Sequence, residues 1–221
     1  YLSTDREDAN GEKIWGRGEV LCKGGNVALG YYMMPEKTKE VFQSDGFYRT
    51  GDIGQFMADG SIRIIDRKKN IVKLKSGEYI ALEKMEMAYG NSKYVDSVSG
   101  GICCYGDGDM DRPVALIQLN RVTAKQWGSD NWTDTDIDKL KKNKTFYDVV
   151  MADLMTEHQK AGLTNLEKLQ AVAFITDPWT PENGGLTAAN KLQRRIVIAL
   201  HEKEFETLRK KGDFSQNVFS K

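Results

Sequence analysis

Asp52 and Arg67 are residues whose types could bind a ligand together. Asp52 ends the motif Y-R-T-G-D, which begins at Tyr48, and Arg67 follows a predicted hairpin. A carboxylate can accept hydrogen bonds from two neighbouring hydroxyl groups, such as those of a ribose, and an arginine supplies a planar fork of donors. The two residues therefore suggest a ligand site assembled from two adjacent segments of chain.

Two further stretches carry residue types that suit a site. The sequence Ser-Gly-Glu at 76–78 is a glycine turn that closes a predicted hairpin, and glycine lacks the Cβ that would block close approach to the backbone. Lys191 follows a glycine pair at 184–185, which suggests a mobile loop, and precedes Arg194. Taken alone, each stretch also has an ordinary interpretation, as a plain turn or as one solvated lysine among many.

The elements that must position these residues follow two patterns. Up to about residue 65 the chain is predicted to be mainly β, with a strand at 18–22, a proline-started helix at 35–42 and a hairpin at 56–64 around an Asp-Gly turn. Strands are then expected at 71–74, 79–80, 95–105, 113–119 and 170–175, and helices at 81–89, 135–160 and 192–208. This order predicts an α+β fold, with a β-rich part at 1–65 and a compact α+β domain at 66–221.

Two of these helices have more detailed expectations. The long amphipathic helix at 135–160 is predicted to begin at a capping Thr135, with Asp138 three residues later. The final helix is expected to bury Leu192, Ile196, Leu200 and Leu208.

Composition argues against several classes of function. The chain has 221 residues with 32 basic and 32 acidic side chains, so its charge gives no argument for binding nucleic acid or a strongly anionic membrane. It has no apolar run of the roughly 18 residues that a spanning helix needs. The cysteines Cys22, Cys103 and Cys104 make a poor disulfide framework and indicate a reducing, intracellular compartment. We expect the adjacent pair to be apolar residues in a buried strand rather than a redox site.

No metal site is predicted. The chain has two histidines, His158 and His201, so no zinc pattern can be drawn. The aspartates at 107, 109 and 111 have the spacing of a calcium loop, but Arg112 stands where an EF-hand needs glycine and Gln118 where it needs the closing glutamate. The acidic run is therefore interpreted as a solvated turn.

Four blocks of sequence resemble one known family. They are residues 18–32 (G-E-V-L-C-K-G-G-N-V-A-L-G-Y-Y), 48–52 (Y-R-T-G-D), 66–86 (D-R-K-K-N-I-V-K-L-K-S-G-E-Y-I-A-L-E-K-M-E) and 186–195 (L-T-A-A-N-K-L-Q-R-R). In this order, and across most of the chain, they are similar to the acyl-adenylate-forming enzymes: acyl-CoA synthetases, luciferases and peptide-synthetase adenylation domains. The third block is most similar to that of long-chain fatty acyl-CoA synthetases, also called long-chain fatty acid–CoA ligases.

The resemblance implies roles for residues in the second and third blocks. Asp52 matches the residue that holds the ribose hydroxyls of ATP and then of the acyl-adenylate. Arg67 matches a second ribose contact, and Tyr48 belongs to the same nucleotide-binding block. Asp66 matches the hinge about which a C-terminal domain swings. Without the resemblance, Asp52 would be interpreted as a turn residue, and Asp66 and Arg67 as part of a surface ion pair.

The resemblance also implies roles further along the chain. Ser76, Gly77 and Glu78 match the turn that approaches the pantetheine arm of CoA after the small domain has rotated. Lys191 matches the catalytic lysine that reaches the α-phosphate of ATP and the attacking carboxylate, where its charge offsets the negative charge that develops. Glu86 matches the family pattern too and is interpreted as structural.

The implied architecture is a small β-barrel-like remnant of a large AMP-binding domain, followed by a mobile C-terminal α+β lid domain as in acetyl-CoA synthetase. The family's glycine-rich phosphate loop and its later Thr-Glu motif do not occur in the chain. The chain is therefore interpreted as a C-terminal fragment that is inactive alone. Mg²⁺ is implied as a cofactor, with its ligands outside this fragment.

The implied reaction of the whole enzyme converts a fatty acid, ATP and CoA into acyl-CoA, AMP and pyrophosphate. Its partner is the missing N-terminal part, and its expected setting is the cytoplasm or the cytosolic face of an organelle membrane, with peripheral membrane association possible. Tyr31, Tyr32, Met33 and Met34 are interpreted as packing residues rather than a fatty-acyl tunnel. Two alternatives stay open: a ligase for an aryl or amino acid with a carrier-protein acceptor, and a non-catalytic interaction module that retains the fold.

Overall fold

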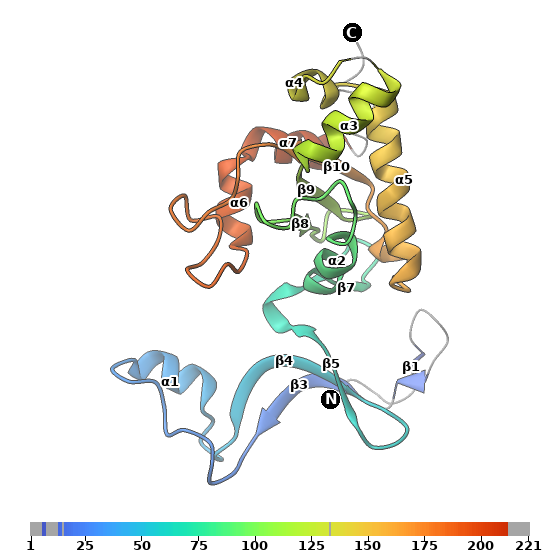
Figure 1. Cartoon of the computed structure of the whole chain (residues 1–221). Helices are drawn as coiled ribbons and strands as arrows, with labels where there is room; N and C mark the ends of the chain where they lie inside the picture. The colour runs from blue at the N-terminus through green and yellow to red at the C-terminus, as the bar shows by residue number, and fades with distance from the viewer. Residues whose placement is uncertain (1–5, 8–12, 15, 133, 212–221) are drawn as a thin grey trace. The chain divides into compact units, whose positions relative to one another are not determined.

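The computed structural model describes residues 6–7, 13–14, 16–132 and 134–211. These residues divide into two compact units, Tyr1–Ile71 and Val72–Lys221, drawn from blue to cyan and from cyan-green to orange-red in Figure 1. The division falls after Ile71, whereas the boundary expected from the sequence falls after residue 65. Each unit is described by itself below.

The first unit is built on an open antiparallel sheet. Its strands lie in the order β3 (Arg17–Cys22), β4 (Tyr48–Phe56) and β5 (Ile62–Arg67), and β1 (Arg6–Glu7) pairs separately with β2 (Lys13–Ile14). The helix α1 (Pro35–Val41) begins at the predicted proline. Gly60, with φ of 84°, turns the β4–β5 hairpin, and the Asp59 carboxylate accepts a hydrogen bond from the Ser61 amide.

The α+β class is confirmed, but the barrel-like form expected for the first unit is not observed in its described residues. A barrel closes only when its first and last strands pair with each other. Here β3 and β5 each pair with β4 and not with one another, so the sheet has two edges.

The second unit begins with a short hairpin and continues into a mixed sheet. The hairpin joins β6 (Ile71–Lys73), whose first residue is the last of the first unit, to β7 (Tyr79–Ala81). The helix α2 (Leu82–Tyr89) follows at once. The sheet has the order β10 (Ala171–Ile175), β9 (Val114–Gln118) and β8 (Ile102–Tyr105), in which β9 and β10 are parallel. A parallel pair needs a long crossover. It is supplied by α3 (Arg121–Asn131), α4 (Ile137–Leu140), α5 (Lys144–Lys160) and the 3₁₀ turn η2 (Asn165–Glu167).

Helices cover both faces of this sheet, so the second unit has three layers (Figure 1). Alternate strand residues face opposite sides. One side packs against α2 and α5 and contains Ile102, Cys104, Ala115, Ile117, Val172, Phe174, Leu82, Met85, Val150 and Leu154. The other packs against α6 (Arg194–Leu200) and α7 (Glu202–Lys211) and contains Cys103, Val114, Leu116, Ala173, Ile175, Trp179, Val197 and Leu208. Cys103 and Cys104 are thus buried in a strand, as expected, one on each face.

The predicted long helix at 135–160 is two helices, because polar side chains cap each of them separately. Asp136 accepts from the amides of Asp138 and Lys139 at the start of α4, and Asn143 accepts from the amide of Phe146 at the start of α5. The expected cap at Thr135 is therefore wrong. The helix α3 was not predicted, and its Gly128 is required because an added Cβ would collide with the carbonyl oxygen of Asp134.

Two other predicted elements are shorter than expected. The strand at 95–105 begins only at Ile102, because Gly100 and Gly101 have φ of 111° and 77° and residues 96–99 form a turn around the Asp96 carboxylate. The helix at 192–208 is divided into α6 and α7 at His201. Ile196 and Leu200 are 37% and 46% exposed, so the expected burial of both is wrong.

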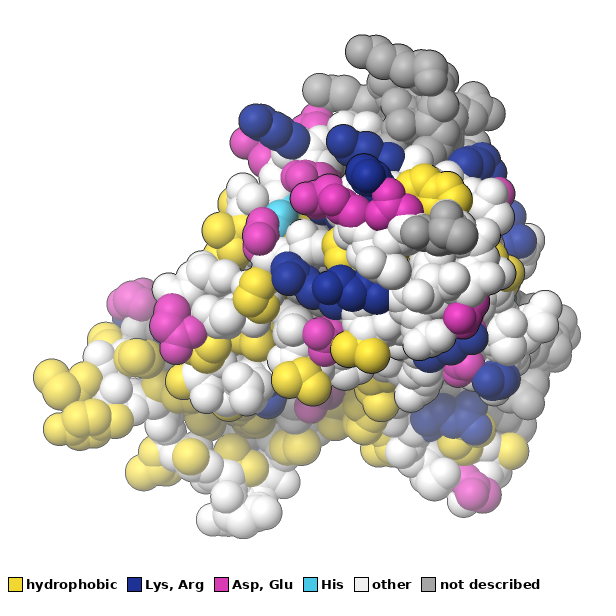
Figure 2. Space-filling model, turned by 45° about the horizontal axis from the view of Figure 1, so that its top comes forward, with side chains coloured by type: hydrophobic (Ala, Val, Ile, Leu, Met, Phe, Trp, Pro, Cys, Tyr) yellow, Lys and Arg dark blue, Asp and Glu magenta, His cyan; other side chains and the backbone are white. Residues whose placement is uncertain are grey.

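The surface of the described chain carries charges of both signs. Figure 2 shows lysine and arginine side chains interspersed with aspartate and glutamate on the face in view. Among the described helices, none is long and apolar enough to cross a membrane.

Candidate functional site

Asp52 and Arg67 lie directly opposite each other on β4 and β5. Arg67 Nε is 2.9 Å from Asp52 Oδ1, and the two side chains are 51% and 37% exposed. Thr50 fixes the local chain, because its hydroxyl donates to the Val20 carbonyl at 2.8 Å and accepts from the Asp52 amide at 3.1 Å. The structure therefore brings together the two residues predicted to contact a ribose, and solvent can reach both.

Asp66, the predicted hinge residue, is 6% exposed at the end of β5. Its Oδ1 accepts from the Arg67 amide at 2.6 Å and from Asn70 Nδ2 at 3.2 Å. These bonds shape the short 3₁₀ turn η1 (Lys68–Asn70), which ends one residue before the last residue of the first unit. The Asp66 carboxylate thus organises the chain that leads to the second unit.

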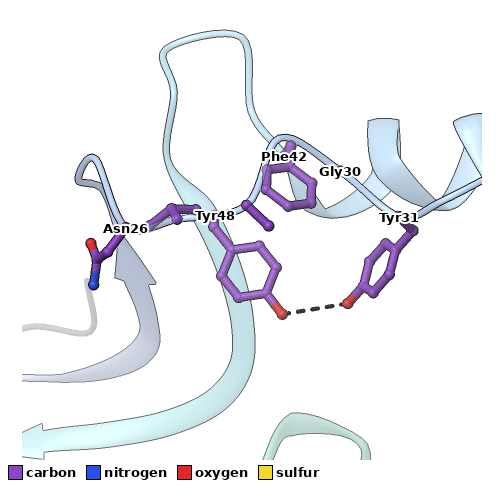
Figure 3. A pocket seen from close by; sticks show the side chains of 7 residues that line it. Asn26, Gly30, Tyr31, Phe42 and Tyr48 are labelled. Carbon is purple, nitrogen blue, oxygen red and sulfur yellow. Dashed lines mark hydrogen bonds between the residues drawn. The ribbon is translucent and has the colours of Figure 1, made fainter.

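Tyr48 lines a pocket of about 310 Å³ within the first unit. Figure 3 shows the rings of Tyr48 and Tyr31 with their hydroxyl groups directed towards each other, 3.4 Å apart, and Phe42 above them. The hydrogen bond with Tyr31 and partial burial raise the pKa of Tyr48. The remaining lining residues are Asn26, Val27, Ala28 and Gly30. This pocket was not predicted from the sequence.

The aromatic and methionine run beside this pocket is not packed as expected. Tyr32, Met33 and Met34 are 90%, 83% and 54% exposed. Met33 adopts φ of 53°, and α1 has no buried residue within the described chain. The interpretation as internal packing is therefore wrong for Tyr32, Met33 and Met34 within this unit, whereas the Tyr31 ring packs edge-on against Phe42.

Ser76, Gly77 and Glu78 form an exposed turn at the tip of the β6–β7 hairpin. The Gly77 amide donates to the Leu74 carbonyl at 2.9 Å, and the Leu74 amide donates to the Glu78 carbonyl at 2.8 Å. Gly77 has φ of 88°, and an added Cβ would meet only Lys73 Cε, at 3.9 Å. The backbone of this turn is therefore fixed and open to solvent, which suits close approach by another molecule.

Lys191 is exposed near the end of the long loop between β10 and α6, drawn in orange in Figure 1. The Thr187 amide donates to the Lys191 carbonyl at 2.8 Å, and the Lys191 amide donates to Thr187 Oγ1 at 3.1 Å. Leu186 and Leu192 pair as an isolated bridge at the base. The segment around Lys191 is a hydrogen-bonded turn that exposes its side chain, and the mobility expected from the glycine pair stays a prediction.

Glu86 and Arg194 form a second acidic–basic pair, which the sequence did not reveal. Arg194 Nη2 lies 2.8 and 2.9 Å from the two Glu86 carboxylate oxygens, and the side chains are 18% (Arg194) and 13% (Glu86) exposed. Burial raises the pKa of Glu86 to about 7, against the opposing effects of the Arg194 charge and the Cys104 amide. The interpretation of Glu86 as structural agrees with these contacts, although its partner lies 108 residues away.

The aspartates of the predicted solvated turn interact with basic side chains. Arg209 Nη2 is 3.1 Å from Asp107 Oδ2 and 3.5 Å from Asp109 Oδ2, and Lys75 lies 4.0 Å from Asp111. Among the described residues, no group of three or more His, Cys, Asp or Glu side chains could hold a metal ion.

The predicted site residues are distributed over both units. Tyr48, Asp52, Asp66 and Arg67 belong to the first, and the turn at 76–78 and Lys191 belong to the second. Each unit therefore offers exposed polar groups of the kind that the sequence predicted, and their assigned roles stay predictions.

Comparison with curated proteins gives clear relatives, although no protein-family model matches the chain. It is 38% identical over 206 residues to Fatty acyl-CoA synthetase B of Dictyostelium discoideum, and 36% identical over 199 residues to Long-chain-fatty-acid--CoA ligase 4 of Saccharomyces cerevisiae. These matches cover 93% and 89% of this chain but 30% and 28% of the two relatives. The chain thus spans less than a third of their length.

Solved structures give the same grouping. The A-PCP didomain of carboxylic acid reductase from Segniliparus rugosus, in complex with AMP, matches with a TM-score of 0.73 and 32% identity over 88% of this chain and 25% of that one. The adenylation domain of a carboxylate reductase from Mycobacterium chelonae matches with a TM-score of 0.73 and 29% identity over 87% of this chain and 28% of that one. The chain therefore belongs to the acyl-adenylate-forming enzymes, and over about nine-tenths of its length it is a homologue of their long-chain-fatty-acid–CoA ligases.

Proposed function

We propose that this chain is part of an AMP-forming long-chain fatty acid–CoA ligase and contributes its ribose-binding pair, its catalytic lysine and its CoA-side turn. The observation that carries the proposal is the exposed Asp52–Arg67 pair, with 2.9 Å between its nearest atoms, in a chain homologous to such ligases. Asp52 can accept from two ribose hydroxyls while Arg67 donates to their oxygens. The similar carboxylic acid reductase domain was solved with AMP, which supports a nucleotide as the ligand.

In the first half-reaction the fatty carboxylate attacks the α-phosphorus of ATP. A new P–O bond forms, the bond to the β-phosphate oxygen breaks, and pyrophosphate leaves with the electron pair. Lys191 supplies a fixed positive charge where negative charge develops on the phosphoryl oxygens. Its exposed side chain on a hydrogen-bonded turn suits this task, because little local reorganisation is needed at the backbone.

In the second half-reaction the CoA sulfur bonds to the acyl carbon and the bond from that carbon to the AMP oxygen breaks. AMP leaves with the electron pair, and the thiol proton is released to solvent. We assign the turn at 76–78 the role of contacting the pantetheine arm of CoA. Its backbone is fixed by hydrogen bonds, and Gly77 has no Cβ that would keep a ligand away from the exposed backbone. Asp66 is assigned to the hinge about which the second unit turns between the arrangement for adenylate formation and the arrangement for thioester formation. A hinge requires a few residues that absorb a change in φ and ψ. The segment from Asp66 to Ile71 ends where the first unit ends.

The rest of the enzyme is proposed to lie outside this chain, because the chain spans less than a third of the length of its relatives. The phosphate loop, the acyl pocket and the ligands of Mg²⁺ are assigned to that part. By itself, the chain is expected to release no pyrophosphate from ATP and a fatty acid.

A second candidate function is an adenylating domain that transfers its acyl group to a carrier protein. It is favoured by the 32% identity to a reductase domain that is joined to its carrier domain. Acyl-adenylate supplied to the full-length enzyme separates the two candidates. Thioester formation with CoA supports the ligase, and transfer only to a phosphopantetheine-bearing carrier domain supports the alternative.

The ribose role is tested with Asp52→Asn in the full-length enzyme that contains this chain. Asparagine keeps the volume but loses the charge and part of the acceptor capacity, so we expect the Kd for AMP to rise about tenfold or more. Asp59→Asn is the matched control, since Asp59 lies in a turn of the same sheet and asparagine can keep its bonds to Ser61. Equal AMP affinity in both variants would contradict the assignment.

A further inference from the structure

At the outer edge of the second unit's sheet, two side chains form hydrogen bonds with the backbone of one strand residue, Cys104. The strand β8 lies at one end of the three-stranded order, so one side of it has no neighbouring strand in that sheet. Cys104 sits in this strand, and its amide donates to Glu86 Oε1 at 2.9 Å. Its carbonyl accepts from Arg194 Nε at 3.0 Å. Glu86 and Arg194 thus occupy the place that a residue of a further strand would take.

The same two side chains also bind each other through the remaining atoms. Arg194 Nη2 donates to both carboxylate oxygens of Glu86, at 2.8 and 2.9 Å. Charge-assisted bonds of this kind are short, strong and directional. The Glu86 and Arg194 side chains are 13% and 18% exposed, and solvent therefore screens the pair less than a surface ion pair. Glu86, Arg194 and the backbone of Cys104 therefore each bind the other two.

This group ties the stem of the Lys191 loop to the sheet. Arg194 is the first residue of α6 and follows Lys191 by three positions, so the two Cα atoms can be at most about 11 Å apart. Between them, Gln193 Nε2 donates to the carbonyls of Gly184 and Leu186 at 2.9 and 3.1 Å. Gln193 therefore closes the loop internally, and Arg194 fixes the closed loop to β8 and, through Glu86, to α2.

We propose that Glu86 and Arg194 are positioning residues for Lys191: they hold the loop that carries this lysine against the edge of β8. This inference rests on the proposed function of Lys191 in adenylate formation. Neither residue needs to contact the substrate. The bond pattern matters as well as the charges, because Glu86 must accept from the Cys104 amide and Arg194 must donate to the Cys104 carbonyl.

The first test measures anchoring without any activity. In the 221-residue chain, hydrogen exchange is followed at residues 186–194 in the original protein, in Glu86→Gln and in Arg194→Lys. Exchange is measured above the Glu86 pKa of about 7, where glutamine removes a negative charge. Lysine removes the planar guanidinium and its Nε donor. We expect faster exchange in this segment by about tenfold, with the amides of β9 and β10 unchanged. The control is Asp148→Asn, which removes an exposed ion pair with Lys144 on α5. Unchanged exchange at 186–194 in both test variants would overturn the proposal.

The second test uses the full-length enzyme and separates the half-reactions. Glu86→Gln and Arg194→Lys are expected to lower kcat for ATP–pyrophosphate exchange by about tenfold or more, because a small displacement of a catalytic group has large effects. Thioester formation from supplied acyl-adenylate should stay within about twofold to threefold of the original rate. If Lys191→Ala abolishes exchange while both variants leave it intact, the positioning role fails and the proposed function stands. If Lys191→Ala itself has no effect, the proposed function fails.

A charge swap shows whether the loop is held by hydrogen bonds to the backbone of Cys104 or by the Glu86–Arg194 ion pair alone. The double variant Glu86→Arg with Arg194→Glu keeps opposite charges together but turns a donor towards the Cys104 amide and an acceptor towards its carbonyl. We expect exchange at 186–194 to remain fast in this variant. Slow exchange at 186–194 in the double variant would show that opposite charges alone suffice. It would overturn the claim that the hydrogen bonds to the Cys104 amide and carbonyl hold the loop.

Discussion

The two units contain acidic–basic pairs of the same chemistry in opposite surroundings. In the first unit, the Arg67 and Asp52 side chains are 51% and 37% exposed, and one contact at 2.9 Å joins them. In the second, the Arg194 and Glu86 side chains are 18% and 13% exposed, and they also bind a backbone amide and carbonyl. An exposed pair is weak and can exchange its partner for a ligand. A largely buried pair holds structure, because removing one partner leaves an uncompensated charge.

The largest difference is expected on deleting the arginine of each pair. Above the Glu86 pKa of about 7, where this carboxylate is charged, Arg194→Ala should lower the free energy of unfolding of the second unit by about 3 kcal/mol or more. The variant leaves both Glu86 and the Cys104 carbonyl without the arginine donor. Arg67→Ala should lower that of the first unit by less than about 1 kcal/mol. Urea unfolding, followed by hydrogen exchange in each unit, measures both. Equal losses would remove the distinction between the pairs.

An intermediate effect is expected from pH. Burial raises the pKa of Glu86 from 4.5 to about 7 in the folded protein. Between these values the folded chain holds a proton that the unfolded chain has released, so stability falls as pH rises through this window. Relative to that of Glu86→Gln, the free energy of unfolding of the original protein should fall by at most about 3 kcal/mol between pH 4.5 and 7. It should fall little further above this range.

The groups that bear on this titration are Arg194 from α6, Glu83 from α2, and Cys104 from β8. Burial raises the pKa of the Cys104 thiol, so this thiol does not titrate in that window. Unfolding of both proteins is measured across the pH range. A constant difference between the original protein and Glu86→Gln would contradict the expected titration of Glu86.

The smallest effect concerns a second contact of the Lys191 loop. Trp179 Nε1 donates to His201 Nε2 at 2.9 Å, which requires an unprotonated acceptor. Burial lowers the pKa of His201 below its usual value of 6.5, with Asp177, Glu204 and Lys141 nearby. Stability should therefore fall as pH falls below 6.5, by about 1 kcal/mol for the lost bond.

Tryptophan fluorescence follows this change, with Trp179→Phe to assign the signal. His201→Gln is the matched variant, since its amide oxygen can accept the bond but does not titrate. An identical pH response in this variant would show that His201 is not the group responsible.

Local signals in the sequence predicted much of the fold. The Asp59-Gly60 turn and Pro35 correctly marked the β4–β5 hairpin and the start of α1, because both act through a few neighbouring residues. The split at Asn143 was missed, since apolar spacing continues across it and only the cap interrupts the helix. The helix α3 has few apolar residues and an internal glycine, so periodicity did not reveal it.

The contacts of the candidate site could be predicted only where the contacting residues are close in the sequence. Asp52 and Arg67 are brought opposite each other by one hairpin, so their pairing follows from a local turn. Glu86 and Arg194 meet across 108 positions, and their contact depends on how α2, β8 and α6 pack. No spacing within the sequence encodes such a contact, whereas the structure shows it directly.

The most direct test of the account is Lys191→Ala in the full-length enzyme, with the two half-reactions measured separately. ATP–pyrophosphate exchange should fall by about a hundredfold or more, because a fixed charge at the developing negative charge is lost. Thioester formation from supplied acyl-adenylate should change by less than about threefold. Equal loss in both half-reactions, or no loss in either, would contradict the role of this lysine.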